Sequence, residues 1–412
     1  MDRRRQNRTD ESTTSDLSIT DSLKGLVLST FGAAVGFYIF GDEEQRSARP
    51  ETILNRMLST KSAISTHSSL AEVYQRAHDD AASRVFAQIG SGQCGTVFAL
   101  KGTTSVIKIP NTTAKREELR LDFLTHKRVY DSFAAASQIR ENIHIPRAIG
   151  WVSPTTTAFW QAKKELFPAD VVTPNFGLIS EHIFPVPMPV REAIVDALLP
   201  KAIKDNKAQF LGKAENKDCL IRIYLGRRKD TRKMDPSSVR LRNFPLHVNE
   251  MERLGLDVAA YAKVMAQALA FMHWRAGVDA NDVEFVMGST PEVVGQPTYE
   301  QLEECDIYTM ADYYKFDFEH RSVGMWLLDF NQCQKFQHSA AGMKKLVEGF
   351  WFNDPYYPRP NATSREDQQL WEVFERHYLE VSAELTEDKH GPRDFIQGVV
   401  EMGKARAGSL FG

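Results

Sequence analysis

The chain contains few cysteines, only 4 in 412 residues. They lie far apart, at positions 94, 219, 305 and 333, and no two have the C-x-x-C spacing. Disulfide-stabilised secreted domains and the usual structural zinc sites both need recurring, closely spaced cysteines. The sequence therefore argues against a disulfide framework, gives no ligands for zinc, and favours a reducing intracellular compartment, most simply the cytoplasm.

A strong charge of either sign is also lacking. The chain has 51 Lys and Arg against 54 Asp and Glu, a formal net charge of -3. Nucleic-acid-binding domains carry a basic surplus on one face, so no nucleic acid partner is expected. With 42% hydrophobic and 25% charged residues, the composition is that of a globular protein long enough for two lobes.

Long hydrophobic runs are scarce as well. The longest uncharged segment, residues 25–41, spans 17 residues, which is the lower limit for a membrane helix. Membrane anchoring by this segment is one interpretation, and a packed or loosely ordered segment, which its glycines and small residues suit, is the one we favour. Residues 1–80 as a whole are predicted to be poorly ordered, apart from an amphipathic helix near Leu70–Ala81.

The most informative motif that is present lies at residues 89–98, IGSGQCGTVF, where Gly90, Gly92, Gly95 and Val97 match G-x-G-x-x-G-x-V. Residues 96–100 are β-branched or apolar and predict a strand rather than the helix of a dinucleotide site. A second strand, residues 105–109, carries Lys108. Glycines let a backbone approach an anion closely, and a lysine supplies the opposing charge. An ordinary glycine-rich hairpin with an exposed lysine is the alternative.

A helix with three acidic residues follows this lysine. Apolar residues recur at helical spacing between residues 115 and 136. Glu117, Glu118 and Asp122 are the available partners for Lys108, and Glu118 is the one we favour. A solvated acidic patch at a helix N-terminus is the alternative for each of them.

Two further segments follow this helix: a strand that is a candidate for contact with a nucleotide base, and a basic segment. The run FGLISEHI at residues 176–183 predicts a strand. Its place in the chain resembles that of the last small-lobe strand and hinge of a kinase, which implies that backbone groups of Glu181 to Ile183 meet an adenine edge. Residues 188–245 are basic and include one strand-like run at 219–226. They are interpreted as an insertion beside the hinge.

The carboxylates of interest lie in the second half of the chain. A strong helix is predicted at residues 256–274, because apolar residues line one face without an internal Gly or Pro. An acidic loop with Asp279 and Asp282 follows it and leads into a short strand. After a long polar insert at 288–322, an apolar strand ends in Asp329-Phe330. Residues 342–377 are predicted to be helical and aromatic.

In this order the pieces resemble the protein-kinase-like fold over roughly residues 85–380. The resemblance implies an α+β fold with two lobes: a small antiparallel β-sheet lobe at 81–187, the basic insertion at 188–245, a larger mainly helical lobe at 246–400, and a tail at 401–412. More narrowly, residues 273–275 (HWR), 278–286 and 353–360 resemble an uncharacterised fungal family often labelled zinc-finger-protein-like. That label implies a metal for which this sequence offers no ligands.

The resemblance also implies roles for single residues. Gly90, Gly92, Gly95 and Val97 match the loop over the ATP phosphates, and Lys108 matches the phosphate-binding lysine. Asp329 matches the Asp that holds Mg²⁺, with Asn331 in place of the following glycine. Asp282 stands where kinases place a metal-binding Asn, and a carboxylate there could also bind Mg²⁺.

One kinase motif is not intact. H-R-D-x-x-x-x-N supplies the carboxylate that accepts the substrate proton, but counting back from Asp282 by its spacing reaches Gly277. Asp279 is the nearest carboxylate that could act as general base, and a turn or cap residue is its alternative role. No A-P-E sequence follows Asp329.

Three functions remain open from the sequence. The first is an atypical phosphotransferase that binds ATP and Mg²⁺ and acts on an unknown protein or small molecule. The second is a catalytically inactive pseudokinase that keeps the nucleotide. In this second case the aromatic residues at 351–357 would form a partner surface if they are not core. The third is a structural or interaction module without nucleotide.

Overall fold

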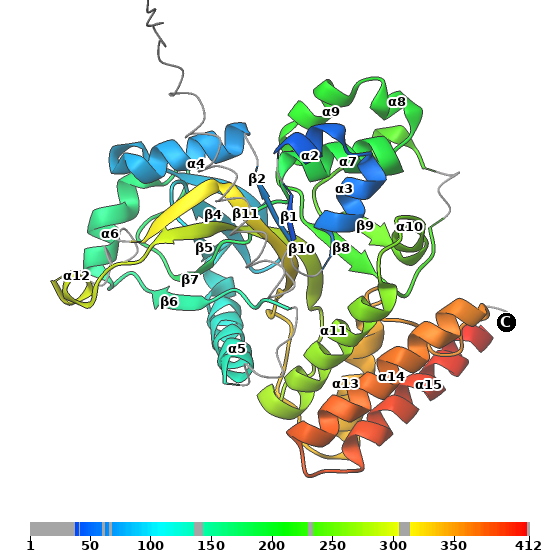
Figure 1. Cartoon of the computed structure of the whole chain (residues 1–412). Coiled ribbons are helices and arrows are strands. Elements are labelled where there is room, and N and C mark those ends of the chain that lie inside the picture. Colours follow the sequence, from blue (N-terminus) through cyan, green and yellow to red (C-terminus); the bar gives the residue numbers. More distant parts are fainter. Residues whose placement is uncertain are drawn as a thin grey trace, which may run out of the picture.

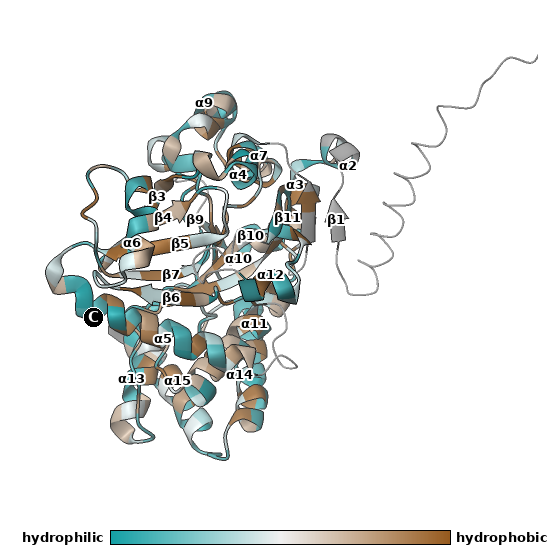
Figure 2. Cartoon of the chain, turned by 90° about the vertical axis from the view of Figure 1, so that its left-hand side faces the viewer, coloured by the Kyte–Doolittle hydropathy of each residue, from teal (hydrophilic) through white to brown (hydrophobic). Residues whose placement is uncertain are grey.

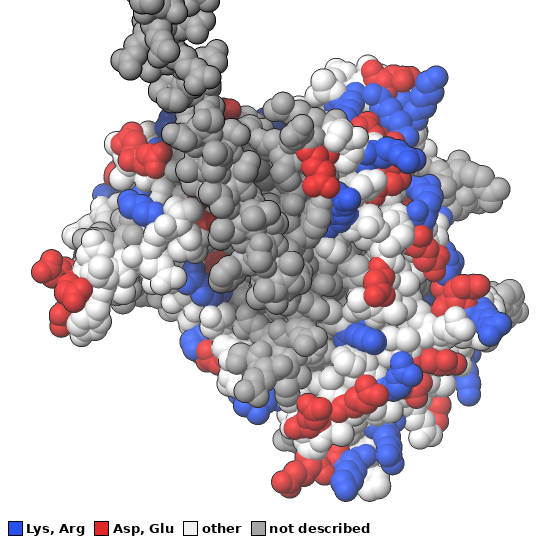
Figure 3. Space-filling view, in the orientation of Figure 1, with Lys and Arg blue, Asp and Glu red and all other residues white. Residues whose placement is uncertain are grey.

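The computed structural model describes residues 38–40, 42–59, 62–65, 68–135, 143–229, 234–304 and 314–409. The fold is of the α+β class, with two β-sheets and a group of long helices (Figure 1). On the face shown in Figure 3, acidic and basic side chains are intermixed rather than gathered by sign.

One sheet has five strands and is antiparallel throughout. Its order is β3 (Phe86–Ser91), β4 (Gly95–Leu100), β5 (Ser105–Pro110), β7 (Gly177–Glu181) and β6 (Ala148–Val152). Figure 2 shows these strands one below another, with α5 (Arg116–Ala134) beneath β6. Leu119, Val129 and Phe133 are buried on the inner face of α5. The small antiparallel sheet and the helix after the Lys108 strand are confirmed.

The other sheet has six strands and is mixed. Its order is β1 (Tyr38–Phe40), β2 (Ser62–Ser65), β11 (Lys315–Leu328), β10 (Glu284–Gly295), β8 (Ile221–Tyr224) and β9 (Phe244–His247). The long hairpin β10–β11 corrects the prediction of a polar insert at 288–322, because both strands extend far into that range. Between them lies α12 (Tyr299–Glu304).

The second half of the chain supplies the long helices (Figure 1). They are α11 (Val258–Ala270), which continues into a π-helical turn η7 (Phe271–Ala276), then α13 (Ala340–Phe352), α14 (Arg365–Leu385) and α15 (Gly391–Ser409). Asp257 caps α11 by accepting from the Ala260 amide. Trp351, Tyr356 and Tyr357 are buried in the core while Phe352 is 57% exposed, so most of this aromatic group packs internally.

The N-terminal region is more ordered than the sequence predicts. It contains α2 (Asp42–Ser47), α3 (Pro50–Met57) and α4 (Ser69–Asp79), of which α4 was expected. Leu54 and Met57 of α3 are fully buried in the main core, where α3 packs against α7 (Met188–Leu198). The prediction of poor order is therefore wrong for α3, because its apolar stripe meets a distant helix.

The apolar segment 25–41 lies mostly outside the described residues. Its residues Tyr38–Phe40 form β1, which pairs with β2. No helix in the described ranges is both long and apolar enough to cross a bilayer. Four short helices and five 3₁₀ turns complete the described elements: α6 (Thr157–Lys163), α8 (Lys201–Lys204), α9 (Lys207–Gly212), α10 (Val248–Arg253), η1 (Ala81–Ser83), η2 (Thr113–Lys115), η3 (Lys164–Leu166), η4 (Ala214–Asn216) and η6 (Pro236–Ser238).

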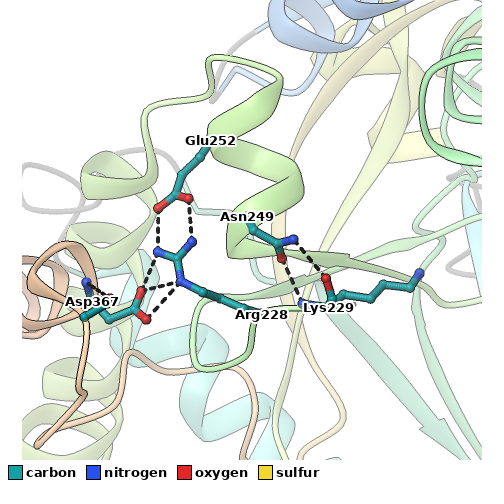
Figure 4. A network of polar contacts seen from close by, with 6 residues as sticks. Arg228, Lys229, Asn249, Glu252 and Asp367 are labelled. Carbon is teal, nitrogen blue, oxygen red and sulfur yellow. Dashed lines mark hydrogen bonds and ion pairs between the residues drawn. The ribbon is translucent and has the colours of Figure 1, made fainter. Parts of the chain in front are cut away.

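Residues 188–245, interpreted from the sequence as an insertion, pack into the body of the molecule. Their strands β8 and β9 complete the six-stranded sheet, and α7 lies in the main core. Just beyond β8, the guanidinium of Arg228 binds the carboxylates of Glu252 in α10 and Asp367 in α14 (Figure 4). The side-chain amide of Asn249 bonds the Lys229 backbone beside it. The basic run at 227–229 thus joins helices that are far apart in sequence.

Candidate functional site

A cavity of about 480 Å³ lies between the two sheets. Its wall on the five-stranded sheet comes from the β3–β4 hairpin, β5 and β7. Its opposite wall comes from β8 and its approach, the start of β10 and the end of β11. The lining residues used below are Ile89, Gly90, Gly92, Val97, Val106, Lys108, Asp122, Leu178, Glu181, Ile183, Asp218, Leu220, Arg222, Arg242, Glu284, Leu328, Asp329 and Phe330.

The glycine motif forms the turn between β3 and β4, which we call the glycine hairpin (residues 90–97). Its turn is closed by the Gly92 amide, which donates to the Gly95 carbonyl at 2.9 Å. Asn111 at the end of β5 holds the turn from the side, donating to the Gly92 carbonyl at 2.8 Å. Gly90 and Gly92 face the cavity. A Cβ at Gly95 would lie 2.7 Å from the Ile109 carbonyl oxygen, so that position excludes a side chain.

The ammonium group of Lys108 forms an ion pair with Asp122, at 2.8 Å. Burial works to lower the pKa of Lys108, but the charges of Asp122 and Asp329 outweigh it and raise the pKa above its ordinary value. The choice of Glu118 as the partner is wrong, because Glu118 points outward and pairs with Lys115 at 2.7 Å.

A sequence signal for the true partner existed. Buried residues of α5 recur at 119, 122, 126, 129 and 133, so Asp122 is the acidic residue on the apolar face. An acid on that face must find a cation, since an unpaired buried charge is costly. Glu117, the third candidate, pairs with Arg120 on the surface.

Asp329 stands directly after β11 and lines the cavity opposite the glycine hairpin. Burial raises its pKa to about 6, and the neighbouring carboxylates of Asp122, Glu284 and Asp282 act in the same direction, against Lys108. Its backbone is left-handed, with φ of 65°, a costly conformation for Asp that often marks functional sites. The next residue, Phe330, is buried and its ring lies 5.2 Å from that of His126 in α5.

Asp282 lies beside the cavity rather than in its lining. Its carboxylate accepts a hydrogen bond from the Gln332 side chain at 2.5 Å. Burial raises its pKa, and Arg222 opposes that shift. Its φ of 62° is also left-handed. Asp282 and Asp329 interact electrostatically, so these two predicted metal ligands are neighbours.

The structure does not bring Asp279 into the cavity lining. Asp279 is 5% exposed, and one carboxylate oxygen accepts from the amides of Asn281 at 3.2 Å and Gln334 at 2.9 Å. It thereby ties the loop before β10 to the loop after β11, which is the turn role considered as its alternative. His273 in η7 is fully enclosed, and burial lowers its pKa to about 3. Its Nδ1 shares a hydrogen bond with the Tyr378 hydroxyl at 2.8 Å.

The predicted hinge residues do line the cavity. The Glu181 carboxylate turns toward Arg147 and accepts from its amide at 3.1 Å. Ile183 packs over Gly288 of β10, where a Cβ would come within 2.4 Å of the Ile183 side chain. The next residue, Phe184, lies beside β10, where it and Ser289 form reciprocal backbone hydrogen bonds.

Four charged lining residues were missed from the sequence: Asp218, Arg222, Arg242 and Glu284. The first three come from residues 188–245, which look peripheral in sequence but supply β8 to the cavity wall. Asp218, Leu220 and Arg222 line the cavity at alternate positions, the period of an extended strand. Arg242 donates to the Ile89 carbonyl at 3.2 Å, so it joins this wall to the strand leading into the glycine hairpin.

Among the described side chains, no group of three or more His, Cys, Asp and Glu is arranged to hold a metal ion. Cys94, Cys219 and Cys333 are buried free thiols. Mg²⁺ is commonly held by one or two protein carboxylates together with substrate phosphates. Asp329 and Asp282 are the carboxylates that would bind it in this protein.

Comparison with known proteins adds one finding. The model of a family of unknown function, described as a zinc finger protein, matches residues 325–390. The match begins within β11, includes Asp329, and runs through α13 and α14. It agrees with the family resemblance of the sequence in this part of the chain, and no set of described residues there is arranged as a zinc site. No curated protein matches the chain.

Proposed function

We propose that this protein binds ATP with Mg²⁺ in the cavity between the two sheets, as a kinase-like protein. The observation that carries the proposal is that Lys108 and Asp329 line one cavity beneath the glycine hairpin. These are the groups that cradle phosphates and hold their metal in phosphoryl-transfer proteins. The strands and helix around them follow each other in the order that the kinase resemblance implies.

The chemistry of the walls fits the parts of a nucleotide. Apolar side chains of Val97, Val106 and Leu178 face those of Leu220 and Leu328 across the cavity, which suits a flat base. The backbone at Glu181 to Ile183 would meet the base edge. The phosphates would lie between the glycine hairpin and Lys108, with Mg²⁺ on Asp329 and Asp282.

Thermal unfolding with and without Mg²⁺ and ATP tests nucleotide binding. A ligand that binds only the folded state stabilises it by about 2.7 kcal/mol at one hundred times its Kd, so the midpoint should rise with ATP concentration. Lys108→Ala should abolish this rise relative to its own ligand-free midpoint. Lys127→Ala, an exposed lysine that lies outside the cavity, is the matched control. A wild-type midpoint that ATP does not move would sink the proposal and leave the interpretation as a structural or interaction module.

A phosphotransferase acting on an unknown protein or small molecule is the active form of this proposal. Asp279 would then have to orient the acceptor hydroxyl, and a general base must reach the proton that it removes. Asp279 is instead buried against two backbone amides outside the cavity lining. This observation favours the second candidate, a pseudokinase that retains the nucleotide.

Turnover separates the two candidates. The protein is incubated with ATP labelled on its terminal phosphate, in an extract that supplies protein, sugar and amine acceptors. Transfer by the wild type that Asp279→Asn reduces at least a hundredfold supports the enzyme. The pseudokinase is supported by ATP binding without transfer.

A further inference from the structure

Strand β8 places a cation in the wall of the cavity. Arg222 lines the cavity wall opposite Lys108, and it reaches that wall from residues 188–245 rather than from the strands that carry the glycine hairpin or Asp329. Its strand is fixed in register, since Arg222 pairs with Val286 of β10 on one side and with Pro245 of β9 on the other. The position of Arg222 is thus set by the sheet.

The neighbours of Arg222 include the hydroxyls of Tyr356 and Tyr224 and the acidic residues at the start of β10. Its guanidinium forms an ion pair with Glu284, which also lines the cavity, and its charge acts on Asp282. Its Nε is buried and has no hydrogen-bond partner within the described part of the chain. Because this Nε is shielded from solvent, a ligand in the cavity would contact the terminal nitrogens of the guanidinium. The side chain remains 26% exposed.

Each wall of the cavity carries a cation–carboxylate pair, and the wall built on β8 has a second one, Arg242 with Asp218 at 3.4 Å. Lys108 pairs with Asp122 on the five-stranded sheet, and Arg222 pairs with Glu284 on the six-stranded sheet. Asp329 lines the same cavity as both pairs, and the charges of Lys108, Asp122 and Glu284 act on it. When Asp282 is counted as well, the carboxylates outnumber the cations. They would repel a polyanion unless Mg²⁺ entered together with it.

We propose that Arg222 is a second phosphate-binding cation, which contacts the outer phosphates of a nucleoside polyphosphate from the wall opposite Lys108. This inference rests on the proposed nucleotide function and narrows it to polyphosphates. A planar guanidinium makes directed, charge-assisted hydrogen bonds to phosphate oxygens. The ion pair with Glu284 holds the guanidinium of Arg222 in the cavity wall.

Calorimetric titration with adenosine, AMP, ADP and ATP, each with Mg²⁺, tests this role. In the wild type the affinity should increase as phosphates are added. In Arg222→Gln the ATP affinity should fall about tenfold or more, the size of a lost charged hydrogen bond, while adenosine binding changes less than about twofold. Arg222→Lys should recover part of the loss. Arg240→Gln, an exposed arginine that lies outside the cavity lining, should leave all four ligands unchanged.

Glu284→Gln gives an independent measurement, because it removes a carboxylate that repels phosphates and frees Arg222. ATP affinity at low Mg²⁺ should increase in this variant. If Arg222 only balances Glu284 inside the protein, Arg222→Gln would weaken adenosine and ATP equally, and Glu284→Gln would not improve binding. Either outcome overturns the inference. If ATP binding requires Lys108 but is unchanged in Arg222→Gln, the inference about Arg222 is wrong and the proposed function stands. If the wild type binds none of the four ligands, both the inference and the proposed function are wrong.

Discussion

At the scale of single residues, the pairing of Lys108 decides how the cavity is charged. The two candidate partners, Glu118 and Asp122, differ by one helical turn of α5, yet one is exposed and the other is 4% exposed. Residues four apart lie on the same side of a helix, so the displacement by one turn along α5, and not their identity as acids, separates them.

Asp122→Asn should therefore destabilise the protein far more than Glu118→Gln. Removing one member of a buried ion pair leaves the other charge uncompensated, and we expect a loss of about 2–3 kcal/mol. The surface pair of Glu118 is worth less than about 1 kcal/mol. Urea unfolding of both variants checks this order. Equal losses would show that Asp122 is not the effective partner of Lys108.

The raised pKa of Asp329, about 6, predicts a pH dependence of stability. The folded state binds the proton more tightly than the unfolded chain, so ionising Asp329 lowers stability as pH rises from about 4 to about 6. Asp329→Asn should remove this cost and stabilise the protein by about 1–2 kcal/mol at pH 7. The gain should shrink as the pH falls toward 4 and vanish near about pH 3, where the carboxyl is protonated in both states.

Unfolding of the wild type and Asp329→Asn at several pH values, with EDTA to remove metal ions, measures the effect. A gain that does not change between pH 4 and pH 7 would show that Asp329 does not titrate in this range.

At the scale of elements, two glycines of the glycine hairpin have different roles, one in strand packing and one in the cavity. Gly95 meets the Ile109 backbone, and its missing Cβ lets β4 and β5 approach. At Gly90 a Cβ would meet only the Val97 Cβ at 3.8 Å, an ordinary contact. Gly95 therefore serves the sheet, while Gly90 leaves space in the cavity.

Gly95→Ala should cost about 1–3 kcal/mol of stability, since a backbone strand must move to admit the methyl group. Gly90→Ala should change stability by less than about 1 kcal/mol. Under the proposed function it should weaken ATP binding, because the new methyl group would lie where the phosphates are proposed to approach the backbone. Thermal unfolding without ligand and ATP titration distinguish the two effects. The assignment fails if Gly90→Ala is the more destabilising change.

At the scale of the whole molecule, distant segments combine into one core. Residues of α3, α7, β8, α11 and α14 belong to a single buried cluster, and Arg228 links residues beside β8 to α10 and α14 (Figure 4). The cavity depends on this assembly, because one of its walls is built on β8.

Leu54→Ala tests whether α3 belongs to that assembly. Leu54 is fully buried, and truncation of such a leucine costs about 2–5 kcal/mol. The loss should appear in the single unfolding transition of the whole protein. Glu51→Ala, on the exposed side of the same helix, should be nearly neutral. A separate early transition in Leu54→Ala would mean that α3 unfolds independently of the core.

The sequence alone determined the local elements with a clear period or motif. It predicted α4, the buried face of α11, the glycine hairpin and the Lys108 strand, since apolar spacing and turn residues act over a few positions. It also singled out Lys108 and Asp329, which the structure brings to one cavity. These features depend on neighbours in the chain.

Only the tertiary structure decided which distant groups meet. It selected Asp122 over Glu118, kept Asp279 out of the cavity lining, and brought Arg222 and Glu284 into it. It also made a cavity wall from β8, in a segment whose basic composition resembles a solvated loop. The physical reason is that strand pairing and burial join residues far apart in sequence, and no local pattern records which strand will lie beside β10.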